Sequence, residues 1–351
     1  MRVLVVNAGS SSLKLRLLGP DDEVERTADT EPGADLDGLV RDWPTPDAVG
    51  HRVVHGGTRF TDPVVIDRTV RKELEDLSAL APLHQPKSLA GLDAVGALLP
   101  DVPAVACFDT AFHATIPEAA ATYAVPRRWR ERYAIRRYGF HGLSHAWCAA
   151  RAAELTGARR VVTAHLGAGA SLAAVLDGRS VDTTMGFTPL EGLVMATRSG
   201  TVDPGLVLWL EEHEHLSPHE VADTLEKRSG LAALAGTADM REVVAAAARD
   251  EADAALALDV YVHRLAAGIA SMAAAAGGLE VLAFTGGVGE HAGGIRTRAA
   301  QRLAFLGVAV DPAQEDSTDG EITGPGAAVR TLVVPAREDL EIARGTRAAL
   351  G

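Results

Sequence analysis

The sequence is poor in cysteine and lysine. Cys107 and Cys148 are its two cysteines, which excludes a disulfide framework and fits a reducing, cytoplasmic compartment. Lysine is so rare that arginine supplies nearly all of the positive charge, and the formal net charge is -13. Because nucleic acid and anionic membranes would both be repelled by this charge, we expect neither as a partner.

Long apolar runs are also missing. The apolar residues after Arg2 end at Asn7, so we expect no signal peptide. The stretch 265–279 is too short for a membrane span, and it consists largely of alanine and glycine. The 351 residues, 47% of them hydrophobic, exceed the usual size of a single core, so we expect two domains.

One pattern occurs twice along the chain. Residues 2–6 predict a buried strand, small polar residues follow at 7–12, and residues 14–18 predict a second strand. Residues 160–176 repeat this order around a glycine-rich turn at 167–169. The repeat indicates a duplicated architecture, and strands that alternate with helices indicate an α/β fold.

A third glycine-rich segment differs from these two. Residues 281–285 predict a strand, and residues 286–291 predict a turn that leads into a helix from about Gly294. A glycine turn between a strand and a helix can bring backbone N–H groups close to an anion or a nucleotide.

Helices and one loop are expected elsewhere. Ser217 and the proline after it predict a helix start, and Gly230 predicts its end. Residues 239–276 are rich in alanine and predict helix. Residues 21–46 are acidic and contain proline and glycine, so we expect a loop or peripheral structure there.

Residues 7–14, NAGSSSLK, form the first stretch that could carry chemistry. Its small residues let backbone amides approach phosphate oxygens, and its hydroxyls and Lys14 add donors and a positive charge. The spacing of a Walker A loop is absent. An ordinary hairpin turn explains the same residues equally well when they are taken alone.

Two charged residues stand near the ends of predicted strands. Arg52 lies between His51 and His55 and before a Gly-Gly pair, which suits an anion site, although exposed polar residues at a strand end give the same pattern. Asp109 follows an apolar run at 102–108. A carboxylate in this position suits metal binding or catalysis in α/β folds, or the capping of a helix.

Three further sites are weaker when taken singly. His141 and His145 are four residues apart and could share a helical face, but a zinc site lacks the usual cysteine pair or intervening glutamate. Residues 185–200 predict a long loop whose Arg198 could close a pocket over an anion. Glu338 follows an apolar run and could enter a cleft as a metal ligand.

Together, these motifs and their order resemble the acetate kinase family, within the superfamily of acetate and sugar kinases, hsp70 and actin. The matching stretches are NAGSSSLK (7–14), HRVVHGG (51–57), APLHQP (81–86), FDTAFH (108–113), YGFHGLSH (138–145), HLGAG (165–169), MGFTPLEGLVMATRSG (185–200) and FTGGVGEH (284–291). They cover nearly the whole chain, and FTPLEG and YGFHG are highly specific.

The resemblance implies a fold of two ribonuclease-H-like, or actin-like ATPase, domains with a central cleft. Residues 1–110 and 340–351 would form the N-terminal domain, and residues 111–339 would form the nucleotide-binding domain. It also implies a homodimer, and domain closure around the substrates, ATP and acetate.

The resemblance further implies roles for individual residues. The catalytic residues would be Asp109, His141, Arg198 and Arg52. Asn7 and Glu338 would hold magnesium (Mg2+), or Mn2+ in its place. Ser10 and Ser12 would belong to the phosphate loop. The acetate pocket would be formed by Arg52, Val54, Leu83, His84, Phe140 and Pro189.

The residues that would bind the nucleotide, ATP or ADP, come from several motifs. They are Lys14, His165, Leu166, Gly167, Ala168, Gly169, Asp239, Met240, Arg241, Gly287, Val288, Gly289, Glu290 and His291. Some positions depart from the family pattern: Ala168 replaces an asparagine, and Ala196 and Thr201 replace glycine and aspartate. The chain is also short for the family between residues 21 and 47.

This resemblance predicts a mechanism without a general base, because acetate is already ionised at neutral pH. Arginines, a histidine and Mg2+ would neutralise two anions that repel each other and align them for in-line transfer. On this view Asp109 positions Mg2+ or water. The alternatives are a propionate or butyrate kinase, a nucleotide-binding module without kinase activity, and a histidine-metal hydrolase.

Overall fold

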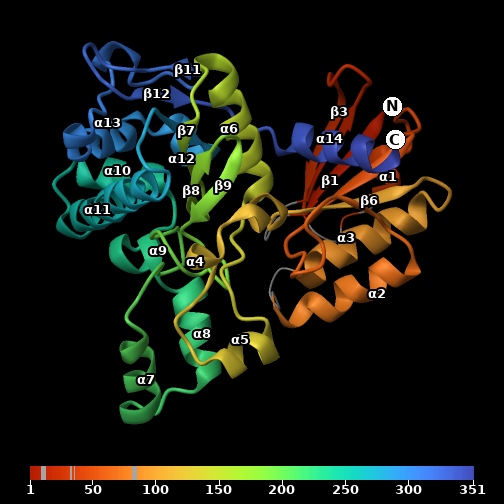
Figure 1. The fold of residues 1–351 in the computed structure, drawn as a ribbon, viewed down its shortest axis with the longest axis horizontal. Helices are drawn as coiled ribbons and strands as arrows, with labels where there is room; N and C mark the ends of the chain where they lie inside the picture. Colours follow the sequence, from red (N-terminus) through yellow and green to blue (C-terminus); the bar gives the residue numbers. More distant parts are fainter. Residues whose placement is uncertain (9–12, 32–33, 35, 81–84) are drawn as a thin grey trace. The chain divides into compact units, whose positions relative to one another are not determined.

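The computed structural model describes residues 1–8, 13–31, 34, 36–80 and 85–351 (Figure 1). The chain divides into two compact units. The first contains residues 1–114, 140–147 and 337–351, and the second contains residues 115–139 and 148–336. The division into domains 1–110 with 340–351 and 111–339 stays a prediction.

The first unit is built on a mixed sheet of six strands in the order β3-β2-β1-β4-β6-β5. Strands β1, β4 and β6 are parallel, and the other neighbours pair antiparallel. The strand bounds are β1 Val3–Ala8, β2 Leu13–Leu18, β3 Val24–Thr30, β4 Ala48–Val53, β5 Val64–Val65 and β6 Ala104–Phe108.

Helices cover both faces of this sheet. Along β1, Val3 and Val5 pack with residues of α14 (Glu338–Leu350), whereas Leu4 and Val6 pack with residues of α1 (Leu36–Val40) and α3 (Gln85–Leu98). The alternation follows from the two-residue period of a strand, and it explains why β1 is apolar throughout. Three further helices are α2 (Arg68–Asp76), η1 (Leu77–Ala79) and η2 (Ala111–Thr115).

The second unit repeats this topology with a six-stranded sheet in the order β11-β12-β10-β7-β8-β9. Strands β7, β10 and β12 are parallel, and β7, β8 and β9 form an antiparallel meander like β1, β2 and β3. The bounds are β7 Arg160–Leu166, β8 Ala170–Leu176, β9 Arg179–Thr183, β10 Val281–Thr285, β11 Gly320–Glu321 and β12 Arg330–Val333. The predicted duplication and α/β class are therefore confirmed.

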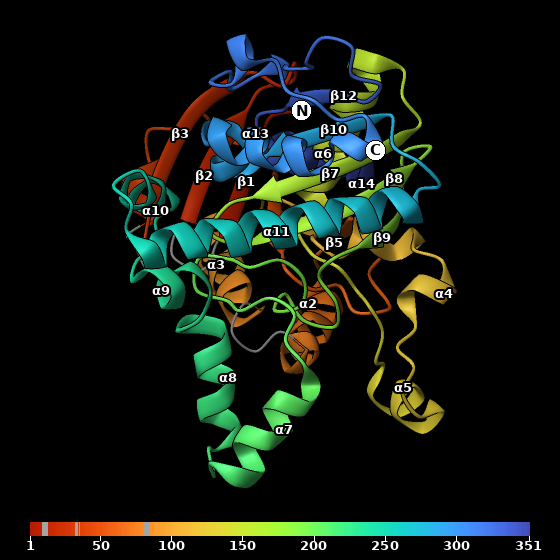
Figure 2. The ribbon, with the colours of Figure 1, turned by 90° about the vertical axis from the view of Figure 1, so that its left-hand side faces the viewer.

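Most helices belong to the second unit, where the long helix α11 packs across β7, β8 and β9 (Figure 2). The helix bounds are α4 Glu118–Ala121, α5 Arg127–Tyr133, α6 Gly142–Thr156, α7 Pro204–His213, α8 Pro218–Lys227, α9 Gly230–Ala235, α10 Met240–Ala247, α11 Ala252–Ala275, α12 Gly286–His291, α13 Gly293–Arg302, η3 Ala304–Leu306 and η4 Pro312–Gln314. Helix α6 begins in the first unit and ends in the second.

Four expectations about local structure differ from what the structure shows. Residues 21–46 hold strand β3 and helix α1, and β3 was missed because it is an edge strand made largely of polar residues. Gly230 does not end α8, which stops at Lys227, but opens α9. Its φ of +62° and the carbonyl oxygen of Met195, 2.2 Å from where a Cβ would be, require glycine there.

The helical segment 239–276 is interrupted, because α10 ends at Ala247 and α11 starts at Ala252. The expected turn at 286–291 is helix α12, which follows β10 directly. Among the residues that the structure describes, no helix combines the length and apolarity needed to cross a bilayer.

Candidate active site

The first unit brings three of the predicted site residues to one edge of its sheet. Asn7 lies near the end of β1, Arg52 lies near the end of β4, and Asp109 follows β6 directly. Because these strands are parallel neighbours, their carboxyl ends meet. The N–H of Asp109 continues the ladder by donating to the carbonyl of Val53 at 3.0 Å.

Arg52 joins these side chains. Its Nε donates to both carboxylate oxygens of Asp109, at 3.1 and 3.0 Å, and its Nη2 donates to Oδ2 at 2.5 Å. Its Nη1 donates to the amide oxygen of Asn7 at 3.2 Å. A guanidinium has five N–H groups, so one hydrogen on Nη1 and one on Nη2 remain after these contacts within the described chain.

Glu338 completes the group. It is the first residue of α14, and its Oε2 accepts a hydrogen bond from Asn7 Nδ2 at 2.7 Å. A carboxylate in the first turn of a helix is stabilised by the helix dipole. The side chains of Asn7, Arg52, Asp109 and Glu338 therefore form one connected cluster, although up to 331 positions separate them in sequence.

Charge in this cluster is largely shielded from water. The side chains of Arg52 and Asp109 are 14% and 2% exposed. Burial would lower the pKa of Arg52, but attraction to Asp109 and Glu338 raises it above its usual range. Burial raises the pKa of Asp109, which Arg52 opposes and nearby Glu338 reinforces. A further cation beside the two carboxylates would relieve their repulsion.

The donors fit Mg2+. Asn7 and Glu338 offer an amide oxygen and a carboxylate, which are hard oxygen ligands that magnesium accepts together with water. In the described ranges, no group of three or more His, Cys, Asp or Glu side chains is arranged to hold a metal.

The YGFHG motif meets Asp109 through the backbone. The N–H of Gly142 donates to the Asp109 carbonyl at 2.8 Å, and a Cβ on Gly142 would lie 2.1 Å from that oxygen. His141 has a φ of +56°, so it precedes α6 rather than belonging to it, and the expectation of a shared helical face with His145 was wrong. Phe140 is buried, with its ring 5.6 Å from that of His55.

The remaining predicted residues of this unit have simple placements. Val54 is buried one residue after β4, and Lys14 is exposed on β2 in register with Asn7. Four predicted residues, Ser10, Ser12, Leu83 and His84, lie outside the described residues.

In the second unit, Arg198 lies on the predicted loop between β9 and α7. Its Nη1 donates to the carbonyl oxygen of Pro189 at 3.1 Å and lies 3.5 Å from the Met195 sulfur. Burial lowers the pKa of Arg198, and the carboxylate of Glu226 opposes this. The loop thus brings Arg198 and Pro189 together.

The second hairpin carries the HLGAG motif. His165 and Leu166 end β7, and residues 167–169 form the turn, where Ala168 is exposed. The carbonyl of Ala168 accepts from the N–H of Ala196 at 3.0 Å, so two of the departures from the family pattern adjoin. Thr201, the third departure, exchanges hydrogen bonds with the backbone of Gly192 at 3.0 Å each.

Asp239 and Arg241 pair with each other at the start of α10. The carboxylate of Asp239 accepts from the side chain and the backbone N–H of Arg241, and these bonds lower its pKa to about 2. Asp239 also caps the helix, and Met240 is buried behind it. The pair lies at the surface, where a nucleoside could meet it.

Gly287, Val288, Gly289, Glu290 and His291 all belong to α12. Oε1 of Glu290 accepts hydrogen bonds from the backbone N–H groups of Gly286 and Ala336, both at 3.0 Å. This side chain therefore joins the first turn of α12 to the segment that leads to Glu338.

Sequence reasoning missed two arginines, the buried Arg296 and the partly buried Arg137. Arg296 on α13 donates to the carbonyls of Gly289 and Glu290 at 2.8 Å, which fixes the end of α12. Arg137 contacts the loop that carries Pro189, through Glu191 at 2.8 Å. Arg137 could have been noticed as the last arginine before YGFHG, but nothing in the sequence distinguishes Arg296 from surface arginines.

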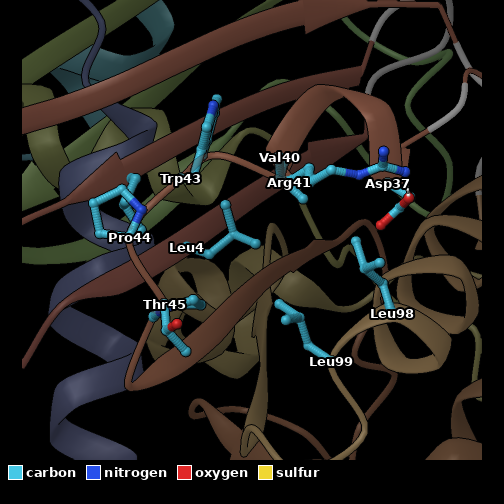
Figure 3. Close-up of a pocket in the computed structure, with 11 residues that line it drawn as sticks. Leu4, Asp37, Val40, Arg41, Trp43, Pro44, Thr45, Leu98 and Leu99 are labelled. Atoms are coloured by element: carbon cyan, nitrogen blue, oxygen red, sulfur yellow. Dashed lines mark hydrogen bonds and ion pairs between the residues drawn. The ribbon is translucent and has the colours of Figure 1, made fainter.

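A pocket of about 220 Å3 lies elsewhere in the first unit, between α1 and the end of α3 (Figure 3). Its lining is mostly apolar and consists of Leu4, Leu17, Asp37, Val40, Arg41, Trp43, Pro44, Thr45, Pro46, Leu98 and Leu99. None of the predicted site residues lines it, so it is separate from the cluster around Arg52.

Comparison with known proteins gives one consistent result. The model of the acetokinase family matches residues 37–344. An acetate kinase from Thermotoga maritima is 42% identical over 99% of this chain and 98% of its own length. One from Nostoc punctiforme is 49% identical, covering 85% of this chain and 75% of its own.

Solved structures agree with the sequence relatives. The Porphyromonas gingivalis acetate kinase has a TM-score of 0.91 at 36% identity, with both chains covered completely. A propionate kinase from Francisella tularensis has a TM-score of 0.93 at 36% identity over 99% of each chain. A putative N-acetylmannosamine kinase from Listeria monocytogenes, at TM-score 0.54 and 11% identity, shares the fold alone.

Proposed function

We propose a function from the premise that the chain belongs to the acetokinase family. It is an acetate kinase, which transfers a phosphoryl group reversibly between ATP and acetate and gives ADP and acetyl phosphate. The observation that carries this proposal is the cluster of Asn7, Arg52, Asp109 and Glu338. In it a buried guanidinium is held in place and, among the described residues, retains two N–H groups without an acceptor.

Positioning and charge neutralisation are sufficient for this reaction. Acetate is ionised at neutral pH and needs no base, so the barrier comes from repulsion between two anions. The fork between Asp109 and Arg52 fixes the plane of the guanidinium, and the two remaining N–H groups match the two oxygens of a carboxylate. Asp109 would therefore act by holding Arg52 rather than by positioning Mg2+ or water, since both of its carboxylate oxygens bind Arg52. His141 and Arg198 would contact the transferred phosphoryl group.

Asn7 and Glu338 would hold Mg2+, or Mn2+ with the same oxygen ligands. When bound, the cation would offset the charge of the phosphates. The amide of Asn7 hydrogen-bonds Glu338 and Arg52, which keeps both oxygen donors beside the guanidinium. The glycine turn at 167–169, residues 239–241 and helix α12 would bind the nucleotide.

A propionate kinase is the second candidate, because the Francisella tularensis structure is as similar as that of the acetate kinase. One methylene in an apolar pocket changes binding by only about 1–3 kcal/mol. Comparing kcat/KM for acetate, propionate and butyrate decides between these substrates.

We further propose a cytoplasmic homodimer. Helix α7 extends away from the sheet of the second unit (Figures 1 and 2), and none of its side chains is buried. It nevertheless presents Leu206, Leu208 and Trp209, which are 44%, 57% and 47% exposed. A helix that is apolar and unburied in one chain suits a contact with a second copy.

Hydroxylamine trapping tests the reaction. The protein is incubated with ATP, acetate and Mg2+, and acetyl hydroxamate is measured, with Mg2+ omitted as a control. We expect hydroxamate only in the complete mixture. Tight ADP binding without acyl phosphate formed from any short carboxylate would instead identify a nucleotide-binding module.

A further inference from the structure

A cluster of three polar side chains in the second unit holds the loop at residues 185–192. Arg137 Nη2 donates to Oε1 of Glu191 at 2.8 Å, and the hydroxyl of Tyr123 donates to Oε2 of the same carboxylate. The Tyr123 oxygen in turn accepts from the N–H of Phe187 at 3.0 Å. Both carboxylate oxygens of Glu191 are therefore engaged.

Arg137 also holds the start of this loop. Its Nη1 lies 3.1, 3.2 and 3.0 Å from the carbonyl oxygens of Thr183, Thr184 and Met185. The same guanidinium thus contacts the chain as it leaves β9 and again at Glu191. The side chain of Arg137 is 17% exposed, and its planar guanidinium donates in both places at once.

Gly186 lies where these contacts converge. A Cβ at this position would be 1.7 Å from Oε2 of Glu191 and 2.0 Å from the Tyr123 oxygen. Its carbonyl accepts from the N–H groups of Tyr138 and Gly139 at 3.0 and 3.3 Å. The loop is therefore fixed by side chains on one side and by backbone on the other.

The loop also supplies a backbone acceptor for Arg198. The carbonyl of Pro189, two residues before Glu191, accepts from Arg198 Nη1 at 3.1 Å. A shift of the loop would move this acceptor and, with it, the guanidinium of Arg198.

We propose that Arg137 and Glu191 are positioning residues for the carboxylate substrate, acting through Pro189 on Arg198. This inference rests on the proposed function, in which Pro189 and Arg198 meet the carboxylate and the phosphoryl group. It assigns the pair an effect on the carboxylate and on the transferred phosphoryl group, and none on the binding of the nucleoside.

Two variants and a matched control test this. Glu191→Gln weakens the charged bond to Arg137, and Arg137→Lys removes the planar fork. Glu280→Gln is the control, because Glu280 accepts from Arg160 at 2.6 Å and from backbone N–H groups in the same unit but outside the loop. We expect KM for acetate to rise roughly tenfold in the first two variants, since small misplacements are costly. KM for ATP should stay unchanged.

Kinetics alone do not separate positioning from general loosening, so hydrogen exchange is measured on the same variants. We expect faster exchange of the amides of residues 186–195 in Glu191→Gln than in the wild type or in Glu280→Gln. Equal rises in KM for acetate and ATP, or unchanged exchange in this loop, would overturn the proposal. If the wild type makes no acyl phosphate, the proposed function fails, while the exchange data still decide whether the pair holds the loop.

Discussion

At the scale of single residues, removing the partner of a buried charge should have a large effect on stability and activity. Asp109→Asn keeps the shape of the side chain but leaves the Arg52 guanidinium without its counter-charge, at 14% exposure. We expect the free energy of unfolding to fall by about 3 kcal/mol, because breaking a buried ion pair strands the other charge. Turnover should fall about a hundredfold or more as Arg52 loses its fixed orientation.

Urea denaturation and steady-state assays measure these two effects. The control is Asp177→Asn, which removes one partner of a similar fork with Arg159 at the surface, and it should change neither quantity. Normal turnover in Asp109→Asn would show that Arg52 needs no carboxylate to orient it.

His51 on β4 should make stability depend on pH. Burial lowers its pKa from 6.5 to about 4, and its Nε2 has no hydrogen-bond partner in the described part of the chain. The folded pKa lies below the unfolded one, so the stabilising contribution is complete above pH ~6.5 and is lost as the pH falls toward 4. The shift corresponds to about 3 kcal/mol.

The measurement is the free energy of unfolding between pH 7 and pH 4. His51→Leu cannot take up the proton, so its stability should fall less over this range than that of the wild type. His55, which burial also brings to a pKa of about 4, keeps part of the dependence. The exposed His219→Gln should retain the full slope, and an unchanged slope in His51→Leu would refute the assignment.

At the scale of elements, helix α8 tests whether a helix start predicted from the sequence contributes to the free energy of unfolding. The Ser217 hydroxyl accepts from the N–H of Glu220 at 3.2 Å, and Pro218 fills the first helical position, as predicted. Ser217→Ala should cost about 1 kcal/mol of unfolding free energy, because one N–H loses its acceptor. Ser217→Asp retains an acceptor and should restore stability in the same denaturation experiment. Equal losses in both variants would mean that the serine does not stabilise the helix by accepting this hydrogen bond.

Other elements show where local signals fail. Strand β3 is stabilised by pairing with β2 rather than by its own apolar pattern, and α12 forms although glycines dominate its sequence. Both depend on contacts with the rest of the sheet, which periodicity does not report. The φ of +56° at His141 could not be predicted from the sequence either, because histidine rarely adopts this angle unless the surrounding structure requires it.

At the scale of the molecule, the parallel order of β1, β4 and β6 explains why these candidate site residues lie together. Once β1, β4 and β6 are recognised as parallel, residues at their carboxyl ends must lie close together, and Asn7, Arg52 and Asp109 do. Arg137 and Glu191 could not be found in this way, because they lie 54 positions apart on irregular segments. Strand order predicts contacts between strand ends, but the path of a loop must be observed.

The apolar surface of α7 leads to a prediction about assembly. Leu208→Asp places a charge on a helix whose Leu206, Leu208 and Trp209 are exposed in one chain, at 57% for Leu208 itself. If α7 meets a second copy, an unpaired carboxylate buried in that contact should shift the protein from dimer to monomer. Light scattering coupled to size-exclusion chromatography reads this directly. Val24→Asp, at a 45% exposed position on the edge strand β3, is the matched control and should stay dimeric. Dissociation of the control instead of Leu208→Asp would place the contact at β3, and a wild type that is monomeric at all concentrations would leave α7 without this role.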